Sequence, residues 1–419
     1  MPRASVTASL ALLGAVATAE AAVLLLRPRE RAVTPAKVDR EAYFSAADVR
    51  RARAYRRPQL VLALADSALA ATILVRLARR PAPALIKLSQ RRTLLGAAGA
   101  GAGLSLTMTA ASLPLAAIGH ARAVRVGLAT QRWPGWLADL ARSTAIATPL
   151  AGAGGALLAA LMGRWPARWW LPGAVAATAI SSGFMVLGPV LLDPVFNNFT
   201  PLEPGPLRDD VIDLAARAGV RVGEVFEVDA SRRTTGANAY VTGLGPTKRV
   251  VLFDTLIERF SPAETRIVIA HELAHVRHRD VQRGLALLAL AAPAALHAAQ
   301  RLTEALAGSA PHPSAAESLP AVVLALGAAM AAVGPVSSQL SRAIERRADA
   351  FALELTRDPA PLIAFERRIV SQNLADPQPP RWLTALIGSH PPAFERVGAA
   401  VAFAQREGIA LARAGHENV

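Results

Sequence analysis

The chain has 419 residues, 53% of them hydrophobic, and a formal net charge of +15. Its mean hydropathy of +0.32 exceeds that of ordinary soluble domains. Cysteine is absent, which excludes disulfides, thiolate metal sites and a cysteine nucleophile. The arginines flank long apolar runs, and few aromatic residues remain outside those runs to stack on bases. The sequence therefore predicts a membrane protein with no nucleic-acid partner.

Seven apolar stretches approach the length of about 20 residues that a bilayer crossing needs. They are Val6–Leu26, Leu60–Val75, Leu94–Ile118, Ala145–Met162, Trp170–Leu192, Gly284–Ala298 and Leu319–Val336. The first could instead be a signal peptide, but Glu20 and the apolar segments that follow favour an uncleaved anchor. The second and sixth are short, and the sixth could simply extend the helix before it. We therefore expect six to eight spans.

The basic residues between these stretches predict an orientation. Residues 27–57 carry ten Lys and Arg, and residues 193–283 carry twelve. Because short cytoplasmic loops are rich in Lys and Arg, we expect the N-terminus outside and both segments, with the C-terminus, in the cytoplasm. The basic residues between Arg79 and Arg92 disagree with this orientation.

Two polar segments, 193–280 and 337–419, lack spans and must hold any chemistry. The pattern of the first segment predicts a short helix over Pro204–Ala218. It also predicts three strands, over Glu224–Asp229, Asn238–Thr242 and Arg249–Asp254, with a turn at residues 243–246. These elements would form a small sheet. A free edge of such a sheet can bind an extended peptide through backbone hydrogen bonds.

Residues 271–275 read His-Glu-Leu-Ala-His. They follow Ser261-Pro262-Ala263-Glu264, a capping box that predicts a helix beginning near Ser261. On that helix His271 and His275 share one face and can bind one zinc ion, with Glu272 beside them as a general base on water. The alternative is a chance pair of histidines on a solvated helix, and with eight histidines in the chain such a coincidence is rare.

A catalytic zinc site needs a third protein ligand. His278 fails, because the helical rise places it about 10 Å from His271, and we expect a solvated residue or a charge at the membrane interface there. Glu345 is the better candidate, and Asp349 on the same helical face can accept a hydrogen bond from a ligating histidine. The alternative is a surface helix whose acids pair with neighbouring arginines, namely Arg342, Arg346 and Arg347.

These features together resemble the type I CAAX prenyl endopeptidases, a family of integral-membrane zinc metalloproteases. The stretches that carry the resemblance are Asp193–Glu203, Gly236–Tyr240 with Val250–Leu256, the histidine motif, Ser341–Asp349, and Ser389–Pro392 followed by Glu395-Arg396. They cover about half the chain in the family's order, and the N-terminal half resembles the family only in hydropathy. The resemblance implies a mainly α fold. About seven transmembrane helices would enclose a chamber, with a gluzincin-type zinc metalloprotease domain and a small β-sheet at its cytoplasmic end.

The resemblance also implies roles for particular residues. One zinc ion per chain would be bound by His271, His275 and Glu345, with Glu272 as the general base. Further site residues would be His390 near the oxyanion, and Asn238, Ala239 and Tyr240 along the substrate backbone. The chain would divide into four parts. Residues 1–192 would be a five-span membrane region, and residues 193–283 the first part of the metalloprotease domain with the histidine helix. Residues 284–338 would hold the sixth and seventh spans, and residues 339–419 the second part of the domain with the third ligand.

The expected partners are the lipid bilayer and a peptide or protein substrate, and whether that substrate is lipidated stays open. The last residues, 415–419, form no endoplasmic-reticulum retrieval signal, which favours a bacterial plasma membrane. One rival is a membrane-protein quality-control metalloendopeptidase. Another is a non-catalytic scaffold or transporter with a vestigial site, which predicts the loss of at least one of the four central residues. Glu20 and Asp66, inside predicted spans, would face a water-filled chamber or lie near an interface.

Overall fold

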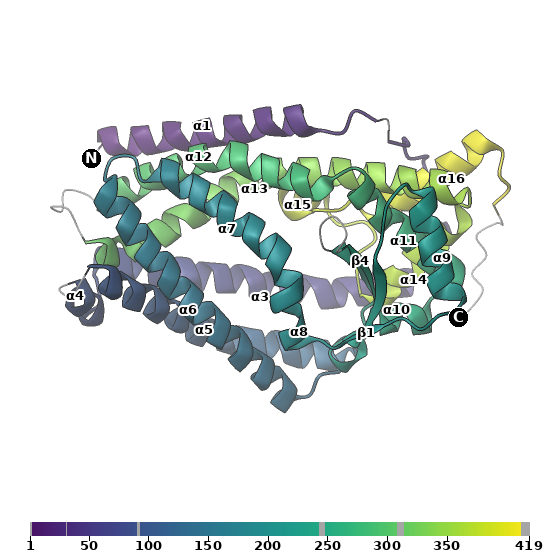
Figure 1. Ribbon diagram of the computed structural model, residues 1–419, viewed down its shortest axis with the longest axis horizontal. Coiled ribbons are helices and arrows are strands. Elements are labelled where there is room, and N and C mark those ends of the chain that lie inside the picture. The colour runs from purple at the N-terminus through teal and green to yellow at the C-terminus, as the bar shows by residue number, and fades with distance from the viewer. Residues whose placement is uncertain (1, 31, 90–92, 243–247, 308–313, 412–419) are drawn as a thin grey trace.

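The computed structural model describes residues 2–30, 32–89, 93–242, 248–307 and 314–411. Long helices run side by side, and a small sheet with several shorter helices lies at one end of them (Figure 1). The long helices are α1 (Pro2–Leu26), α3 (Ala46–Arg79), α5 (Thr93–Arg125), α6 (Trp133–Arg164), α7 (Trp170–Leu191), α12 (Asp280–Ala307) and α13 (Ala315–Thr356). All seven have the length and apolar composition of membrane-crossing helices.

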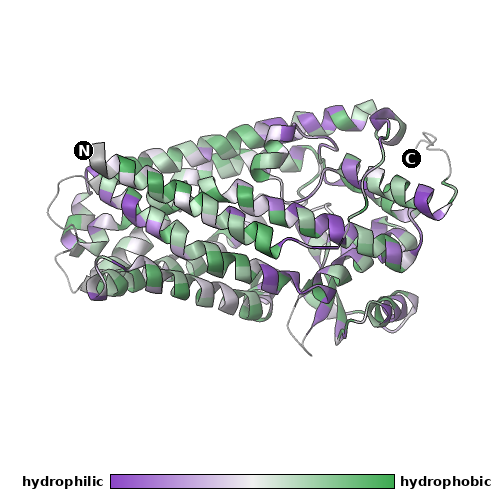
Figure 2. Cartoon of the chain, turned by 90° about the horizontal axis from the view of Figure 1, so that it is seen from above, coloured by the Kyte–Doolittle hydropathy of each residue, from purple (hydrophilic) through white to green (hydrophobic). Residues whose placement is uncertain are grey.

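The outer surfaces of these helices are apolar. Leu24, Leu64 and Val190 are each at least 60% exposed, as are other leucines and valines on the same helices. So much exposed apolar surface is stable only when another apolar phase covers it. Hydrophobic residues dominate along the long helices, and hydrophilic residues gather at the end that holds the sheet (Figure 2). The predicted seven-span membrane protein is confirmed.

Small residues allow the long helices to pack closely. A side chain on Gly155 of α6 would place its Cβ 2.3 Å from the Ala97 carbonyl oxygen of α5, and one on Gly101 would come equally close to Ala151. In α1, Ala15 and others pack against α12 and α13. Such small-residue contacts are typical of helix pairs inside membranes, where van der Waals packing drives association.

Two helices differ from the expected spans. The short stretch Gly284–Ala298 lies inside α12, which does not continue the histidine helix α11 (Pro262–Arg277). Arg279 adopts a left-handed conformation (φ 56°) between them, so the interpretation of one continuous helix is wrong. The seventh stretch lies inside α13, a helix of 42 residues that begins at a Ser314 capping box and crosses residue 338 without interruption.

The sheet has four strands in the order β1-β2-β4-β3. Strands β2 (Glu224–Val228), β3 (Ala239–Thr242) and β4 (Arg249–Phe253) match the predicted ones, whereas β1 (Phe199–Pro201) was missed. β2 and β4 are parallel, and the outer pairs are antiparallel. β3 is therefore an edge strand, and the turn expected at residues 243–246 lies outside the described residues.

A hydrophobic core joins the sheet to the helices around it. It contains Val250 and Leu252 of the sheet together with Leu273 of α11 and Leu353 of α13, all fully buried. The helices that complete it are α9 (Pro206–Arg217), α14 (Ala360–Gln372) and α16 (Ala393–Glu407). The histidine helix thus packs into this core.

The remaining elements are α2 (Arg40–Tyr43), α4 (Pro83–Ser89), α8 (Asp193–Phe196), η1 (Ala230–Arg232), α10 (Asp254–Arg259) and α15 (Arg381–Ile387).

Candidate active site

The histidine helix begins where its sequence predicts. The Ser261 hydroxyl accepts a hydrogen bond from the Glu264 amide at 3.3 Å, and the Glu264 carboxylate accepts one from the Ser261 amide at 2.7 Å. Pro262 occupies the first helical position. This reciprocal cap satisfies backbone donors that the first turn leaves unpaired. It fixes the face on which His271 and His275 lie.

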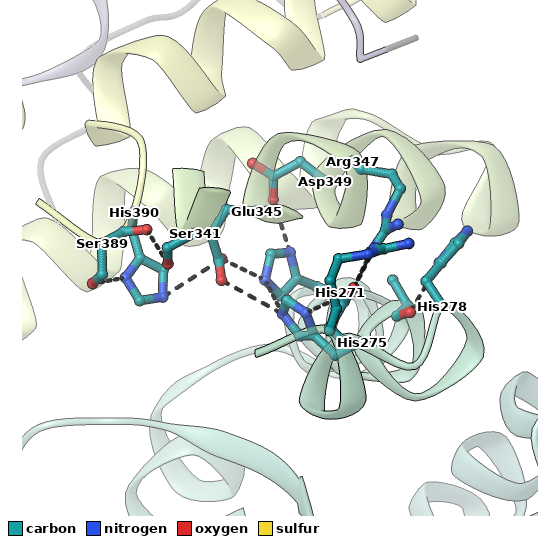
Figure 3. Close-up of polar contacts among 12 residues, drawn as sticks. His271, His275, His278, Ser341, Glu345, Arg347, Asp349, Ser389 and His390 are labelled. Atoms are coloured by element: carbon teal, nitrogen blue, oxygen red, sulfur yellow. Dashed lines mark hydrogen bonds and ion pairs between the residues drawn. The ribbon is translucent and has the colours of Figure 1, made fainter. Parts of the chain in front are cut away.

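Three ligand atoms converge between α11 and α13 (Figure 3). His271 Nε2 lies 3.2 Å from Glu345 Oε2 and 3.3 Å from His275 Nε2, and His275 Nε2 lies 3.7 Å from Glu345 Oε1. Bonds of about 2.0–2.1 Å at tetrahedral angles would separate ligand atoms by about 3.3 Å. The spacing of these three residues therefore fits a tetrahedral metal ion with one position left for water.

Both histidines are oriented by carboxylates on their outer side. His271 Nδ1 donates to Asp349 at 2.8 Å, as expected, and His275 Nδ1 donates to Asp280 at 3.1 Å. The two Nε2 lone pairs and the Glu345 carboxylate then face one another, which only a cation makes favourable. Burial alone would lower the pKa of His271, but hydrogen bonds to Asp349 and Glu345 raise it to about 10.

Asp349 and Asp280 are in turn held by arginines. Arg396 donates to both oxygens of Asp349, at 2.9 and 2.6 Å, and it also pairs with Glu366. Burial opposes the charge of Arg396, but these carboxylates raise its pKa above the ordinary value. Asp280 accepts hydrogen bonds from Arg347 and Arg283. Each of the two histidines therefore ends a chain of charged side chains.

The alternative of a solvated acidic helix is wrong. Glu345 and Asp349 are 8% and 3% exposed. The nearby arginines pair elsewhere: Arg342 donates to the carbonyls of Thr384 and Gly388, Arg346 binds Glu395, and Arg347 binds Asp280. Glu345 and Asp349 thus point inward, toward the histidine helix.

A cavity of about 590 Å³ opens beside this cluster. Its wall includes His271, Glu272, Asn238, Ala239 and His390. Burial raises the pKa of the Glu272 carboxyl above its usual range, which makes it a stronger base once ionised. His271, Glu272, Asn238, Ala239 and His390 therefore share one cavity, although they come from three segments of the chain.

His390 lies beside the cluster formed by His271, His275 and Glu345. Its Nε2 is 3.5 Å from Glu345 Oε2, and its Nδ1 is 2.8 Å from the Ser389 hydroxyl. The Ser341 hydroxyl donates to the Ser389 carbonyl at 2.8 Å, which ties this loop to α13 (Figure 3). The imidazole side chain is 64% exposed. It is therefore accessible from the cavity.

Tyr240 differs from what the sequence suggested. Among the described residues, it is not part of the cavity wall. Burial and the neighbouring Asp193, to which it is hydrogen-bonded, raise the pKa of its hydroxyl to about 12. His278 is half-buried at the end of α11, where it contacts the Ala274 carbonyl oxygen at 2.9 Å and packs edge-on against Phe351.

Sequence reasoning missed Asp280 and assigned no role to Arg396. Asp280 follows the histidine helix directly, and a carboxylate just past a two-histidine motif would have been a usable signal. Arg396 stands in the Glu395-Arg396 pair that carried part of the family resemblance. Because Arg396 lies far from α11 in the sequence, no spacing rule relates it to the histidine helix.

A second cavity of about 500 Å³ lies within the long helices and has an almost wholly apolar wall, which includes Leu104, Leu158, Ile180 and Leu326. Neither Glu20 nor Asp66 is part of the wall of either cavity described here. Glu20 instead contacts Gln339 at 3.4 Å.

A helical bundle that crosses a membrane and carries a His-Glu-x-x-His helix with a downstream glutamate defines a membrane metalloprotease. The sequence profile of peptidase family M48 matches residues 201–404. An uncharacterized metalloprotease of Bacillus subtilis, YhfN, is 30% identical over 292 residues, which cover 68% of each chain. The chain belongs to peptidase family M48.

CAAX prenyl proteases are also similar to this chain. CAAX prenyl protease 1 of Saccharomyces cerevisiae is 36% identical over 33% of this chain and 31% of its own length. A homolog from Oryza sativa is 34% identical over 53% of each chain. The crystal structure of S. mikatae Ste24p superposes with a TM-score of 0.73 at 22% identity and covers 96% of this chain and 99% of its own. The fold is therefore shared, and the resemblance to the CAAX prenyl endopeptidases is confirmed.

Proposed function

We propose that this metalloprotease is a zinc-dependent endopeptidase whose ligands are His271, His275 and Glu345. The observation that carries the proposal is the convergence of their ligand atoms, all within 4.8 Å of one another. The donor set contains imidazole and carboxylate without thiolate, which is typical of catalytic zinc sites. A bound zinc ion would activate water and polarise a peptide carbonyl.

The chain's own residues would then carry the proton transfers and hold the substrate. The free edge of β3 would bind an extended peptide through the main chain of Ala239, next to the exposed Asn238. Glu272 would take a proton from the attacking water and deliver it to the leaving amine. If the Ser389 hydroxyl donates to His390 Nδ1, His390 Nε2 carries the hydrogen and can stabilise the oxyanion.

We infer a cytoplasmic position for the site in a bacterial plasma membrane. The N-terminus of α1 lies at the end of the bundle opposite the sheet (Figure 1), and the basic segment after α1 contacts the metalloprotease part where Ala36 donates to the Gly398 carbonyl. The positive-inside rule then supports cytoplasmic catalysis. The matching YhfN of Bacillus subtilis supports a bacterial membrane.

The substrate class has two candidates. The names of the yeast and rice relatives support cleavage of a prenylated CAAX peptide, whereas a quality-control endopeptidase would cleave unfolded membrane proteins. We propose the first, and no described feature favours a nucleic acid. The third candidate, a non-catalytic scaffold, requires a decayed site. All four central residues are present, however, and ligand atoms of His271, His275 and Glu345 lie within 4.8 Å of one another.

One experiment tests the proposed function. Purified protein in lipid nanodiscs is given farnesylated and unprenylated versions of one CAAX peptide and, separately, an unfolded membrane protein. Metal content is measured on the same sample. We expect about one zinc ion per chain and preferential cleavage of the farnesylated peptide. Zinc-loaded protein that cleaves only the unfolded protein would favour quality control, and protein that binds no zinc would contradict the proposal.

A further inference from the structure

The free edge of β3 extends back to Ala237, two residues before the strand begins. There the backbone groups are already hydrogen-bonded to a side chain of another segment. The Phe253 amide of β4 donates to the Asn238 carbonyl at 3.1 Å, so the main chain of Asn238 faces β4. Alternate residues of an antiparallel strand direct their N–H and C=O groups to opposite edges. The main-chain groups of Ala237 and Ala239 therefore face the free edge, where a substrate peptide would pair.

At Ala237, a side-chain amide takes the place of a neighbouring strand. Asn373 Oδ1 accepts from the Ala237 N–H at 3.1 Å, and Asn373 Nδ2 donates to the Ala237 C=O at 3.3 Å. These are the two hydrogen bonds that a paired strand residue would make. Asn373 also lines the active-site cavity beside Ala239 and Glu272. A Cβ on Gly236 would come 3.1 Å from Asn373 Oδ1, so glycine there permits the close approach.

Asn373 is held firmly in this position. It ends α14, where its backbone N–H donates to the Ile369 carbonyl at 2.8 Å. Arg56 of α3 donates to the carbonyls of Asn373 and Leu374, at 3.1 and 2.9 Å. Leu374 is buried and left-handed (φ 47°), a conformation that a residue with a side chain keeps only when its surroundings hold it. A transmembrane helix thus braces the turn that presents the Asn373 amide.

We propose that Asn373 is a positioning residue that ends the substrate's strand pairing at Ala239 and so limits how far the peptide extends along the edge on that side. The inference rests on the proposed peptidase function. A peptide paired with Ala239 would place its next pairing residue, about two positions along, where the Asn373 amide lies. The site then selects peptides whose chain ends near the scissile bond on that side.

The test uses one scissile sequence in two peptide series, extended stepwise by two residues on the amino side or on the carboxyl side. kcat/KM is measured by mass spectrometry of the products for the wild type, Asn373→Ala and Gln372→Ala, all in nanodiscs. Gln372 is the matched control, because its side chain binds the neighbouring Thr235 carbonyl and leaves Ala237 blocked.

For the wild type, we expect kcat/KM to fall beyond a fixed length on one side only. Asn373→Ala should raise the long-to-short ratio on that side about tenfold, as two more backbone hydrogen bonds to the peptide would give, while Gln372→Ala leaves the ratio unchanged. A uniform loss on all peptides with an unchanged ratio would show a merely structural role and overturn the inference. A zinc-loaded wild type that cleaves no peptide would instead reject the proposed function, and this inference with it.

Discussion

His275 and Asp280 lie five residues apart in the sequence but on two different helices, and the Nδ1 of His275 is 3.1 Å from the Asp280 carboxylate. The contact exists because α11 ends before Asp280, at the left-handed Arg279. Asp280 also accepts a hydrogen bond from Arg347 of α13. One carboxylate therefore connects the histidine helix to both of the last transmembrane helices.

Replacing Asp280 by Asn should weaken metal binding. The amide keeps the size of the carboxylate but accepts a hydrogen bond from His275 less strongly, and loss of such a partner typically costs 10–100-fold in metal affinity. Competition with a chelator measures the effect. Asp213→Asn is the control, because Asp213 forms an exposed ion pair with Arg217 on α9. Equal affinity in the two variants would mean that Asp280 does not orient His275.

The Glu272→Gln variant should keep its metal and lose catalysis. The amide cannot accept a proton from water, and general acid–base catalysis contributes about 10²–10⁴-fold. Peptide cleavage and metal content are measured on the same preparation. Near-normal turnover with bound metal would exclude Glu272 as the base.

Glu345→Gln should leave the protein folded but with well below one metal ion per chain. The substitution removes the only carboxylate among the three ligands and leaves the two imidazoles without a negative partner. Glu354→Gln is the matched control, since Glu354 lies on the same helix and is exposed. Elemental analysis compares the two, and full metal occupancy in Glu345→Gln would contradict the assigned ligand set.

Glu366 should make stability depend on pH. Burial raises the pKa of this carboxyl from 4.5 to about 7, so between these values the folded protein holds a proton that the unfolded chain has lost. The free energy of unfolding should therefore fall as pH rises through that window. Thermal unfolding at pH 5 and pH 8 measures this, and Glu366→Gln, which cannot ionise, should show a smaller change. An equal change in both proteins would assign the pH dependence to other groups.

Gly155→Val should destabilise the contact between α5 and α6. The added side chain would collide with the Ala97 carbonyl, and overpacking of this kind costs about 1–3 kcal/mol. Gly154→Val is the control, because nothing lies within 4 Å of a Cβ at that position. Thermal unfolding in detergent should show a lower Tm for Gly155→Val alone.

Local rules were sufficient to predict the histidine helix and to single out Glu345 as the candidate for the third ligand. A capping box fixes the start of α11, and spacings of four residues place His271 with His275 and Glu345 with Asp349. The strands β2, β3 and β4 also follow from short apolar runs. The three-residue strand β1 does not, because its pattern is too short to separate from a loop.

The parts that sequence could not predict depend on tertiary contacts. Asp280 reaches His275 only because α11 ends before Arg279, which adopts the left-handed conformation that is unusual for arginine. Arg396 and Asn373 come from C-terminal segments, and no periodicity relates them to residues about 100 positions or more earlier. Their roles follow from how α14 packs on the histidine helix and how α16 packs on α14 and α13.

The helix α13 is one uninterrupted rod from Ala315 inside the bundle to Thr356, and it carries Glu345 near its far end. A change in bilayer thickness that tilts this rod would shift a carboxylate relative to two imidazoles on a separate helix. We therefore expect the catalytic rate to depend on lipid chain length, and assays in thin and thick membranes to give different rates.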